Sequence, residues 1–155
     1  MWAPWRSQYL TQEQPKDCIF CTKPKEERDP ENYILFRNTK SFAILNIFPY
    51  NNGHTMVVPF RHAASLDSLS PEELEDIMVA SRWVTQALTA TYHPDGFNLG
   101  MNIGASAGAG IAGHIHMHIV PRWNGDTNFM PIVGETKVVN EALDETYRKL
   151  VQSLI

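Results

Sequence analysis

The chain has 155 residues, of which 43% are hydrophobic and 19% are charged, a composition typical of an ordinary globular protein and unlike that of a disordered one. Its 13 basic and 17 acidic side chains give a formal net charge of −4, which argues against binding to a nucleic-acid backbone. No apolar run approaches the roughly 18 residues of a membrane span, and the opening MWAPWRSQYL lacks the apolar core of a signal peptide, so membrane and secreted proteins are also disfavoured.

Residues 1–32 carry four prolines and a stretch of mixed charge, so we expect an irregular segment that begins with an N-terminal arm over residues 1–16. Both cysteines of the chain, Cys18 and Cys21, lie in this segment. Two close thiols without an export signal fit a reducing compartment, so we expect a cytoplasmic protein. We find no internal repeat and no long linker, and we expect one domain over residues 1–155.

The next part of the chain has the pattern of β-strands. Apolar and β-branched residues concentrate at 33–36 and at 42–45, and the short polar connection between them predicts a hairpin. A turn by composition follows at 49–53, and the run at 55–58 predicts a third strand that Pro59 ends.

A long helix is predicted after these strands. Ser70 is suited to the N-cap, Pro71 to the first helical position, and two acidic residues follow in the first turn. Apolar residues at helical spacing extend to about Tyr92. We expect further strands at 97–103 and 114–120, and a closing helix over 139–154 within the C-terminal segment 134–155. This order predicts an α+β fold with a mainly antiparallel sheet.

Three alternating histidines in the last predicted strand are the chemically informative feature. Alternate residues of a strand project to one face about 6.6 Å apart, so His114, His116 and His118 would line up there. Such a row of imidazoles can bind a metal, move protons or attack an electrophile. A catalytic zinc site is an alternative, because His-x-His on a strand can chelate that metal.

A glycine-rich loop, residues 104–113, comes directly before the histidines. Its backbone N–H groups could bind an anion, although such loops are often only flexible connectors. His54 adds a fourth imidazole at the entrance of the third strand. Together these features predict a site for phosphoryl or nucleotidyl transfer.

The run from His114 to Val120 resembles the His-φ-His-φ-His-φ-φ signature of the histidine triad (HIT) superfamily of nucleotide hydrolases and transferases. The segments FAILN at 42–46 and GHTMVVP at 53–59 agree with it, and so does Pro121-Arg122. The opening MWAPWR and residues 121–129 resemble the bacterial branch described as diadenosine tetraphosphate phosphorylases or fragile-histidine-triad-like proteins. The resemblance implies a HIT fold, whose mainly antiparallel five-stranded sheet carries one long and one C-terminal helix, and it implies a homodimer.

The resemblance also implies roles for individual residues. His116 corresponds to the nucleophile that takes up a nucleotidyl group, while His118 and His54 correspond to residues that contact phosphate and help the leaving group depart. Asn46 corresponds to the position that recognises ribose, and Asn102 to a polar residue that contacts phosphate.

The glycine-rich loop both adds binding residues and departs from the family pattern. We expect Gly108, Gly110 and Ile111 to contact the nucleotide or its phosphates. Many relatives have glutamine and a hydroxyl residue where this chain has Gly110 and Ile111. Because glutamine there could orient water, its absence favours phosphate as the acceptor. The implied activity is cleavage of a dinucleoside polyphosphate, with hydrolysis of that substrate or of an adenosine phosphoramidate, and non-catalytic nucleotide binding, as alternatives.

Cys18 and Cys21 offer two soft metal ligands at a spacing that suits zinc, and a tetrahedral site would need two histidines more. A redox pair and two idle thiols are the alternatives. In zinc-bearing relatives the remaining ligands correspond to His62 and His114. The resemblance therefore implies a structural zinc ion, and magnesium could accompany a polyphosphate substrate.

Overall fold

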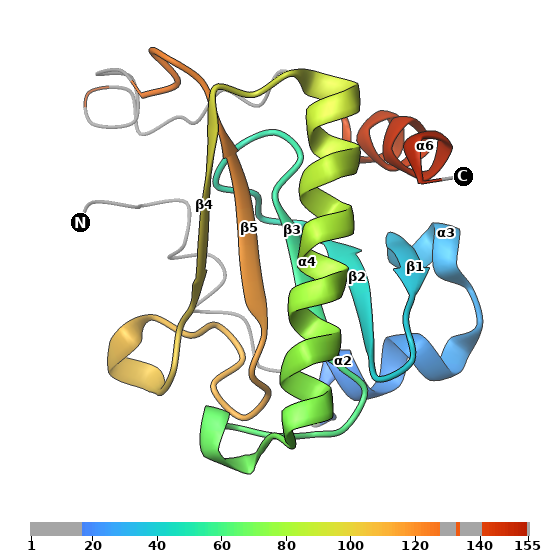
Figure 1. The fold of residues 1–155 in the computed structure, drawn as a ribbon, viewed down its shortest axis with the longest axis vertical. Coiled ribbons are helices and arrows are strands. Elements are labelled where there is room, and N and C mark those ends of the chain that lie inside the picture. Colours follow the sequence, from blue (N-terminus) through green and yellow to red (C-terminus); the bar gives the residue numbers. More distant parts are fainter. Residues whose placement is uncertain (1–16, 128–132, 134–140, 155) are drawn as a thin grey trace.

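The computed structural model describes residues 17–127, 133 and 141–154. Within this part of the chain five strands form one antiparallel sheet in the order β1-β2-β3-β5-β4 (Figure 1), as predicted. The strands are β1 (Ile34–Arg37), β2 (Ser41–Leu45), β3 (Thr55–Pro59), β4 (Gly96–Met101) and β5 (Met117–Arg122). β1 and β2 form the predicted hairpin, and β4 lies at the other edge of the sheet.

The long helix α4 (Pro71–Tyr92) begins and ends where the sequence predicts. The hydroxyl of Ser70 accepts from the backbone N–H of Glu73, whose carboxylate accepts from the N–H of Ser70, so the two residues form a capping box. Arg61 holds the same carboxylate with two hydrogen bonds of 2.6 and 2.8 Å. The helix ends at His93, which adopts a left-handed conformation.

The sheet buries an apolar layer on each face. α4 covers one face, where Val57, Ile119 and Leu88 belong to the larger core cluster (Figure 1). Because side chains alternate along a strand, the neighbouring residues Met56 and Val58 belong to the other face, where they pack with Phe20 in a second cluster. By the same alternation, His116 and His118 lie on the face of the sheet that α4 does not cover.

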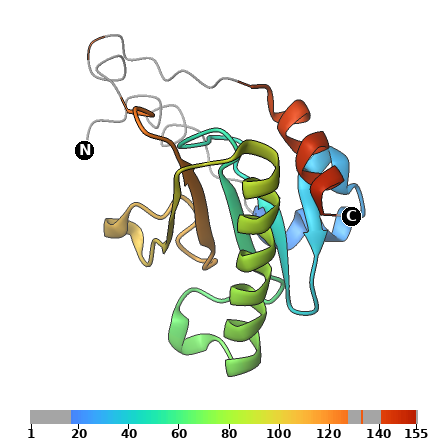
Figure 2. The ribbon, with the colours of Figure 1, turned by 45° about the horizontal axis from the view of Figure 1, so that its top comes forward.

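The C-terminal helix α6 (Leu143–Ser153) packs against α4 and against β1 (Figures 1 and 2). It begins later than the predicted start at residue 139, and residues 134–140 lie outside the described part of the chain. Its first turn contains Asp144 and Glu145, which favour a helix N-terminus. No helix among the described residues is both long and apolar enough to cross a membrane.

The prediction of an irregular start is wrong for the part of it that the structure describes. This part contains α2 (Ile19–Thr22), the 3-10 helix η1 (Lys23–Glu26) and α3 (Asp29–Asn32). Pro24 and Pro30 lie in the first turns of η1 and α3, where proline is favoured, and so they begin helices here. The predicted arm over residues 1–16 lies outside the described residues. Two more short 3-10 helices, η2 (Leu66–Ser68) and η3 (Ala105–Ala107), connect larger elements.

The last two strands differ in extent from the prediction. β4 ends at Met101, and β5 begins at Met117, so His114 and His116 lie just before the strand. The N–H of His114 donates to the carbonyl of Ile111 in a turn, and the N–H of Ile115 donates to Ala63 outside the sheet. These bonds keep the chain out of the β3 ladder until Met117, which pairs with Val57.

Candidate active site and metal centre

A cavity of about 100 Å³ lies on the face of the sheet opposite α4. Its apolar walls come from β2, β3 and α2, and its polar residues include Asn46, His116 and His118. The glycine-rich loop closes one side through Gly108, Gly110 and Ile111. The structure thus brings six of the predicted binding and catalytic residues together around one cavity.

His116 lines this cavity, and one nitrogen of its ring is held by the backbone. Its Nδ1 lies 2.8 Å from the carbonyl oxygen of His114. A carbonyl can only accept, so Nδ1 carries the proton and Nε2 of the neutral ring keeps its lone pair. The side chain is 4% exposed, and this burial lowers the pKa of His116, which favours the neutral ring. Phe20 packs against the imidazole, with the ring centroids 5.0 Å apart.

His54 and His118 form a hydrogen-bonded pair whose tautomers follow from the backbone. The N–H of Tyr50 donates to Nδ1 of His54 over 3.0 Å, so in the neutral ring the proton lies on Nε2. That Nε2 lies 3.0 Å from Nδ1 of His118 and donates to it. The proton of His118 therefore lies on Nε2. The rings of His116 and His118 are in contact, with centroids 4.6 Å apart. The site therefore combines the lone pair of His116 with a hydrogen-bond donor, the Nε2–H of His118.

Two predicted residues occupy positions that the sequence did not indicate. His54 is 1% exposed and lines neither described cavity, so it contacts the site through His118. Asn102 donates from Nδ2 to the carbonyl of Gly108 over 3.4 Å, and it lines a second cavity beside the first. Asn46 lines the first cavity, and its Oδ1 accepts from the N–H of Phe48.

The four predicted metal ligands form one cluster. The ligand atoms of Cys18, Cys21, His62 and His114 all lie within 4.8 Å of one another. Nδ1 of His114 lies 3.3 Å from the sulfur of Cys18, and Nδ1 of His62 lies 3.3 Å from that of Cys21. The other ring nitrogen of His114, Nε2, donates to the carbonyl of Pro59 over 2.9 Å. This bond leaves the Nδ1 lone pair directed at the two sulfurs, which is how a histidine is prepared to ligate a metal. Two thiols and two imidazoles are a donor set that suits tetrahedral zinc.

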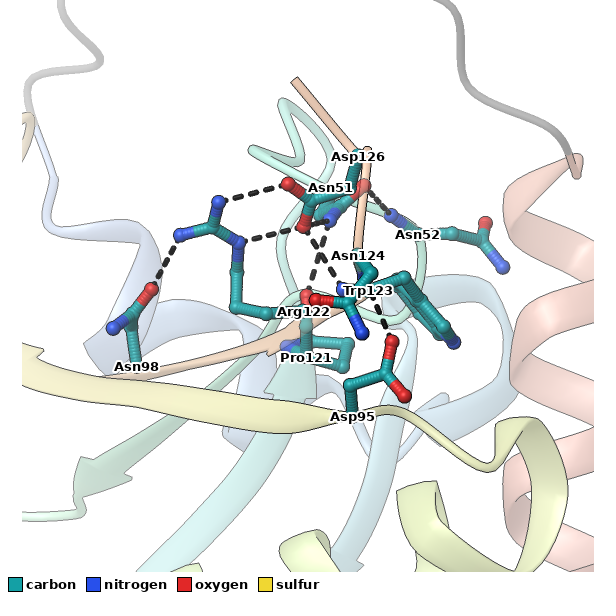
Figure 3. A network of polar contacts seen from close by, with 9 residues as sticks. All are labelled: Asn51, Asn52, Asp95, Asn98, Pro121, Arg122, Trp123, Asn124 and Asp126. Atoms are coloured by element: carbon teal, nitrogen blue, oxygen red, sulfur yellow. Dashed lines mark hydrogen bonds and ion pairs between the residues drawn. The ribbon is translucent and has the colours of Figure 1, made fainter.

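A polar network beyond the end of β5 was not predicted (Figure 3). Asp126 accepts two hydrogen bonds from Arg122, of 2.6 and 2.8 Å, one from Asn51 of 2.8 Å and one from the N–H of Trp123. Arg122 also donates to Oδ1 of Asn98 on β4. These donors lower the pKa of Asp126 to about 2, with the Arg122 hydrogen bonds as the main cause. The Asn-Gly turn at 124–125 was the available signal, because it folds the chain back toward Arg122.

Comparison with known proteins finds similarity both in sequence and in structure. The family model described as HIT domain matches residues 27–125. A protein named AP-4-A phosphorylase from Mycobacterium tuberculosis is 37% identical over 158 aligned residues, which cover 97% of this chain and 81% of the relative. A zinc-bound histidine triad family protein from Mycobacterium smegmatis has a similar structure, with a TM-score of 0.73 and 27% identity over 89% of this chain and 93% of the other. A hypothetical histidine triad nucleotide-binding protein from Sulfolobus tokodaii has a TM-score of 0.72 and 28% identity, covering 88% and 91% of the two chains.

Proposed function

The chain belongs to the HIT domain family and is an enzyme of the phosphorylase or hydrolase kind, and we propose that it cleaves a phosphoanhydride bond of a dinucleoside polyphosphate such as diadenosine tetraphosphate. The named activity of the mycobacterial relative, at 37% identity over nearly the whole chain, supports this substrate class. The proposed reaction transfers a nucleotidyl group first to His116 and then to inorganic phosphate.

The observation that carries the proposal is the orientation of His116. Its Nδ1–H is held by the carbonyl of His114, so the lone pair of Nε2 is the nucleophile. In the first step Nε2 forms a bond to phosphorus, and the bond between that phosphorus and the bridging oxygen breaks. The oxygen departs with the leaving nucleotide as a phosphate anion, to which the Nε2–H of His118 donates a hydrogen bond. His54 holds His118 in this tautomer through their own hydrogen bond.

The second step returns His116 to its starting state. An unprotonated oxygen of inorganic phosphate attacks the same phosphorus, and the P–N bond breaks with its electron pair on Nε2 of His116, while His118 keeps its proton. Diadenosine tetraphosphate and phosphate would thus yield ATP and ADP. Phosphate is favoured over water because the loop carries Gly110 and Ile111, neither of which offers a polar side chain that could orient a water molecule.

Product analysis tests the acceptor. The protein is incubated with diadenosine tetraphosphate with and without phosphate, and with and without magnesium. ADP and ATP formed only with phosphate are the expected products, whereas AMP and ATP without phosphate would indicate a hydrolase. In a parallel incubation, cleavage of an adenosine phosphoramidate without cleavage of the dinucleotide would indicate an adenosine phosphoramidate hydrolase. Nucleotide binding without any product would indicate a non-catalytic nucleotide-binding protein, the role that the name of the Sulfolobus neighbour describes.

Replacement of the nucleophile tests the mechanism. We expect His116→Ala to lose at least a thousandfold in turnover, because the covalent route is absent, while AMP still binds the first cavity. His93→Asn is the matched control, since His93 is exposed after α4 and asparagine tolerates its left-handed conformation. If His116→Ala retained a tenth of the wild-type rate, covalent catalysis by His116 would be wrong.

We further propose that Cys18, Cys21, His62 and His114 hold a structural zinc ion, which is supported by their clustered ligand atoms and by the zinc-bound neighbour. The ion would join α2 to the segment before β5 and supply folding energy rather than chemistry at phosphorus. The nucleophile His116 takes no part in this cluster.

We also propose that the chain forms the predicted homodimer, and the edge of the sheet supports this proposal. β4 is an edge strand, and the side chain of Leu99 is 45% exposed on it, so pairing with a second copy would cover both the edge and the apolar side chain. Light scattering during size-exclusion chromatography should then report twice the mass of one chain.

A further inference from the structure

Lys23 brings an ammonium group to the first cavity. Among the described residues that line this cavity it is the only lysine, and no arginine, aspartate or glutamate joins it there. Lys23 is the first residue of η1, and it is half-buried. Its ammonium makes no hydrogen bond and no ion pair with any residue in 17–127 or 141–154, and Glu26 of the same helix attracts it only from a longer distance. The cation is therefore available to a ligand in the cavity.

The chain from Cys18 to Lys23 leads past the nucleophile and away from it. The sulfur of Cys18 lies 3.3 Å from Nδ1 of His114, and the ring of Phe20 packs against that of His116. Lys23 follows Phe20 by three residues, directly after the end of α2. A nucleotide joined to Nε2 of His116 has its phosphorus at that imidazole, so its base lies in a part of the cavity farther along these walls.

The walls suit the flat faces of a base. Ile19, Phe20, Ile44 and Met56 supply apolar surface, against which an aromatic ring system packs well. The polar atoms of a base lie on its edges and need partners that these side chains do not offer. A lysine can pack its four-carbon stem along an apolar wall while its ammonium reaches such a polar edge.

We infer that Lys23 recognises the base of the nucleotide that becomes attached to His116, and that the first cavity prefers guanine to adenine. This preference rests on the proposed function and deepens it, because it names the base of the transferred nucleotide. A dinucleotide with guanosine in the attached half is then the better substrate.

The hydrogen-bonding edges of the two purines give the preference its direction. An ammonium group has three donors and no acceptor. Guanine presents two neighbouring acceptors, N7 and O6, whereas adenine presents the acceptor N7 beside the donating 6-amino group. Lysine therefore pairs with both atoms of guanine but with only one atom of adenine. Because the side chain is only half-buried, water weakens the contact, and we expect a preference of about tenfold.

Binding is measured by calorimetry with three mononucleotides, GMP, IMP and AMP, on the wild-type protein purified without chelators. GMP should bind about tenfold more tightly than AMP. IMP, which has O6 and N7 but lacks the 2-amino group of guanine, should bind like GMP. Lys23→Met removes the ammonium and keeps an unbranched stem, so it should abolish the difference by weakening GMP and IMP while AMP stays within about twofold. Lys25→Met is the matched control, because Lys25 is an exposed lysine of the same helix that does not line the cavity.

A mixed dinucleotide, with adenosine at one end of the tetraphosphate and guanosine at the other, shows in each turnover which half was attached. When Nε2 of His116 bonds to the phosphorus next to guanosine, the bond from that phosphorus to the bridging oxygen breaks and ATP leaves. Phosphate then takes the guanylyl group and gives GDP. The opposite orientation gives GTP and ADP. Lys23→Met should lower the ratio of GDP to ADP about tenfold relative to wild type, and Lys25→Met should leave it unchanged.

The outcomes separate this preference from the proposed function. GMP and AMP in place of GDP and ADP would make water the acceptor, and their ratio would test Lys23 equally well. Absence of any product would contradict the proposed function, while the three mononucleotides would still decide the role of Lys23. An equal loss of GMP and AMP affinity in Lys23→Met would assign the ammonium to phosphate and overturn the inference. So would wild-type protein that binds AMP as tightly as GMP, or IMP that binds like AMP, and these two comparisons need no variant that must fold.

Discussion

The hydrogen-bonded carboxylate of Asp126 supports a quantitative prediction about stability. Asp126→Asn preserves the shape of the side chain but removes the charge that pairs with Arg122 and replaces one acceptor oxygen with a donor. The carboxylate has a pKa of about 2 in the folded protein, against an ordinary value of 3.8. At about 1.4 kcal/mol per unit, this shift corresponds to at most about 2.5 kcal/mol of stabilisation at neutral pH.

The measured loss should be smaller, because solvent screens the pair. The Asp126 side chain is 8% exposed, but that of Arg122 is 41% exposed. We therefore expect Asp126→Asn to lower the free energy of unfolding by about 1 to 2 kcal/mol at pH 7. For a chain of this size, that is a fall of about 2 to 8 °C in Tm.

The sign of the pH dependence follows from the lowered pKa. The unfolded state binds a proton at Asp126 before the folded state does, so the stabilisation is fully present above about pH 5 and is lost as the pH falls toward 2. About half of the difference between wild type and Asp126→Asn should be gone at pH 3. Urea unfolding of both proteins at pH 7 and pH 3, followed by tryptophan fluorescence, measures this difference. Release of a metal at low pH affects both proteins alike and cancels.

Asp95→Asn is the matched control. Asp95 accepts from the N–H of Asn124, and asparagine keeps an oxygen for this bond, so stability should stay within about 0.5 kcal/mol of wild type. A difference between wild type and Asp126→Asn that is equally large at both pH values would refute the electrostatic reasoning, since loss of packing alone does not titrate.

Three further predictions concern the metal cluster and the fold. Protein purified without chelators should contain about one equivalent of zinc by elemental analysis, and Cys21→Ser should lower both the zinc content and the Tm; a full Tm without zinc would contradict the site. Gly53→Ala should cost about 1 to 3 kcal/mol by urea unfolding, because the residue has a φ of +76° and its Cβ would lie 2.8 Å from Leu88, whereas Gly125→Ala, at a φ of +79° in open space, should cost less. Ser70→Ala should cost about 1 kcal/mol through the lost capping box, and an unchanged unfolding midpoint would show that the cap is dispensable.

The elements that sequence reasoning predicted well are those whose signals are local. The start of α4 follows from Ser70 and Pro71, and the hairpin of β1 and β2 follows from two apolar runs around a short polar connection. The short helices after Cys18 were missed for a related reason. Their prolines were interpreted as breaks in regular structure, although proline is equally suited to the first turn of a helix.

Features that depend on contacts between distant segments were predicted less well. The metal cluster could be anticipated through the family resemblance, which supplied His62 and His114 as partners for the two cysteines. The network of Arg122, Asp126 and Asn51 and the second cavity were not anticipated, because they join the ends of β4 and β5 to the loop before β3. The Asn-Gly turn at 124–125 indicates only a local reversal of the chain, and no periodicity or short motif predicts which distant residues it will contact.

The histidines show most clearly what residue identity does and does not determine. The sequence identified four imidazoles for one site, but an imidazole can act as donor or acceptor at either nitrogen. In the structure a backbone group decides three of the four cases: the carbonyl of Pro59 for His114, that of His114 for His116, and the N–H of Tyr50 for His54. The ring of His54 then decides the fourth, His118.

His114 also connects the two proposed centres. Its ring nitrogen Nδ1 faces the thiols, while its carbonyl holds the proton of His116. The residue that would ligate the proposed metal is thus also the one that orients the proposed nucleophile. We therefore expect loss of the metal to lower kcat more than nucleotide affinity, because the first cavity is formed mainly by other elements while the direction of the His116 lone pair depends on His114.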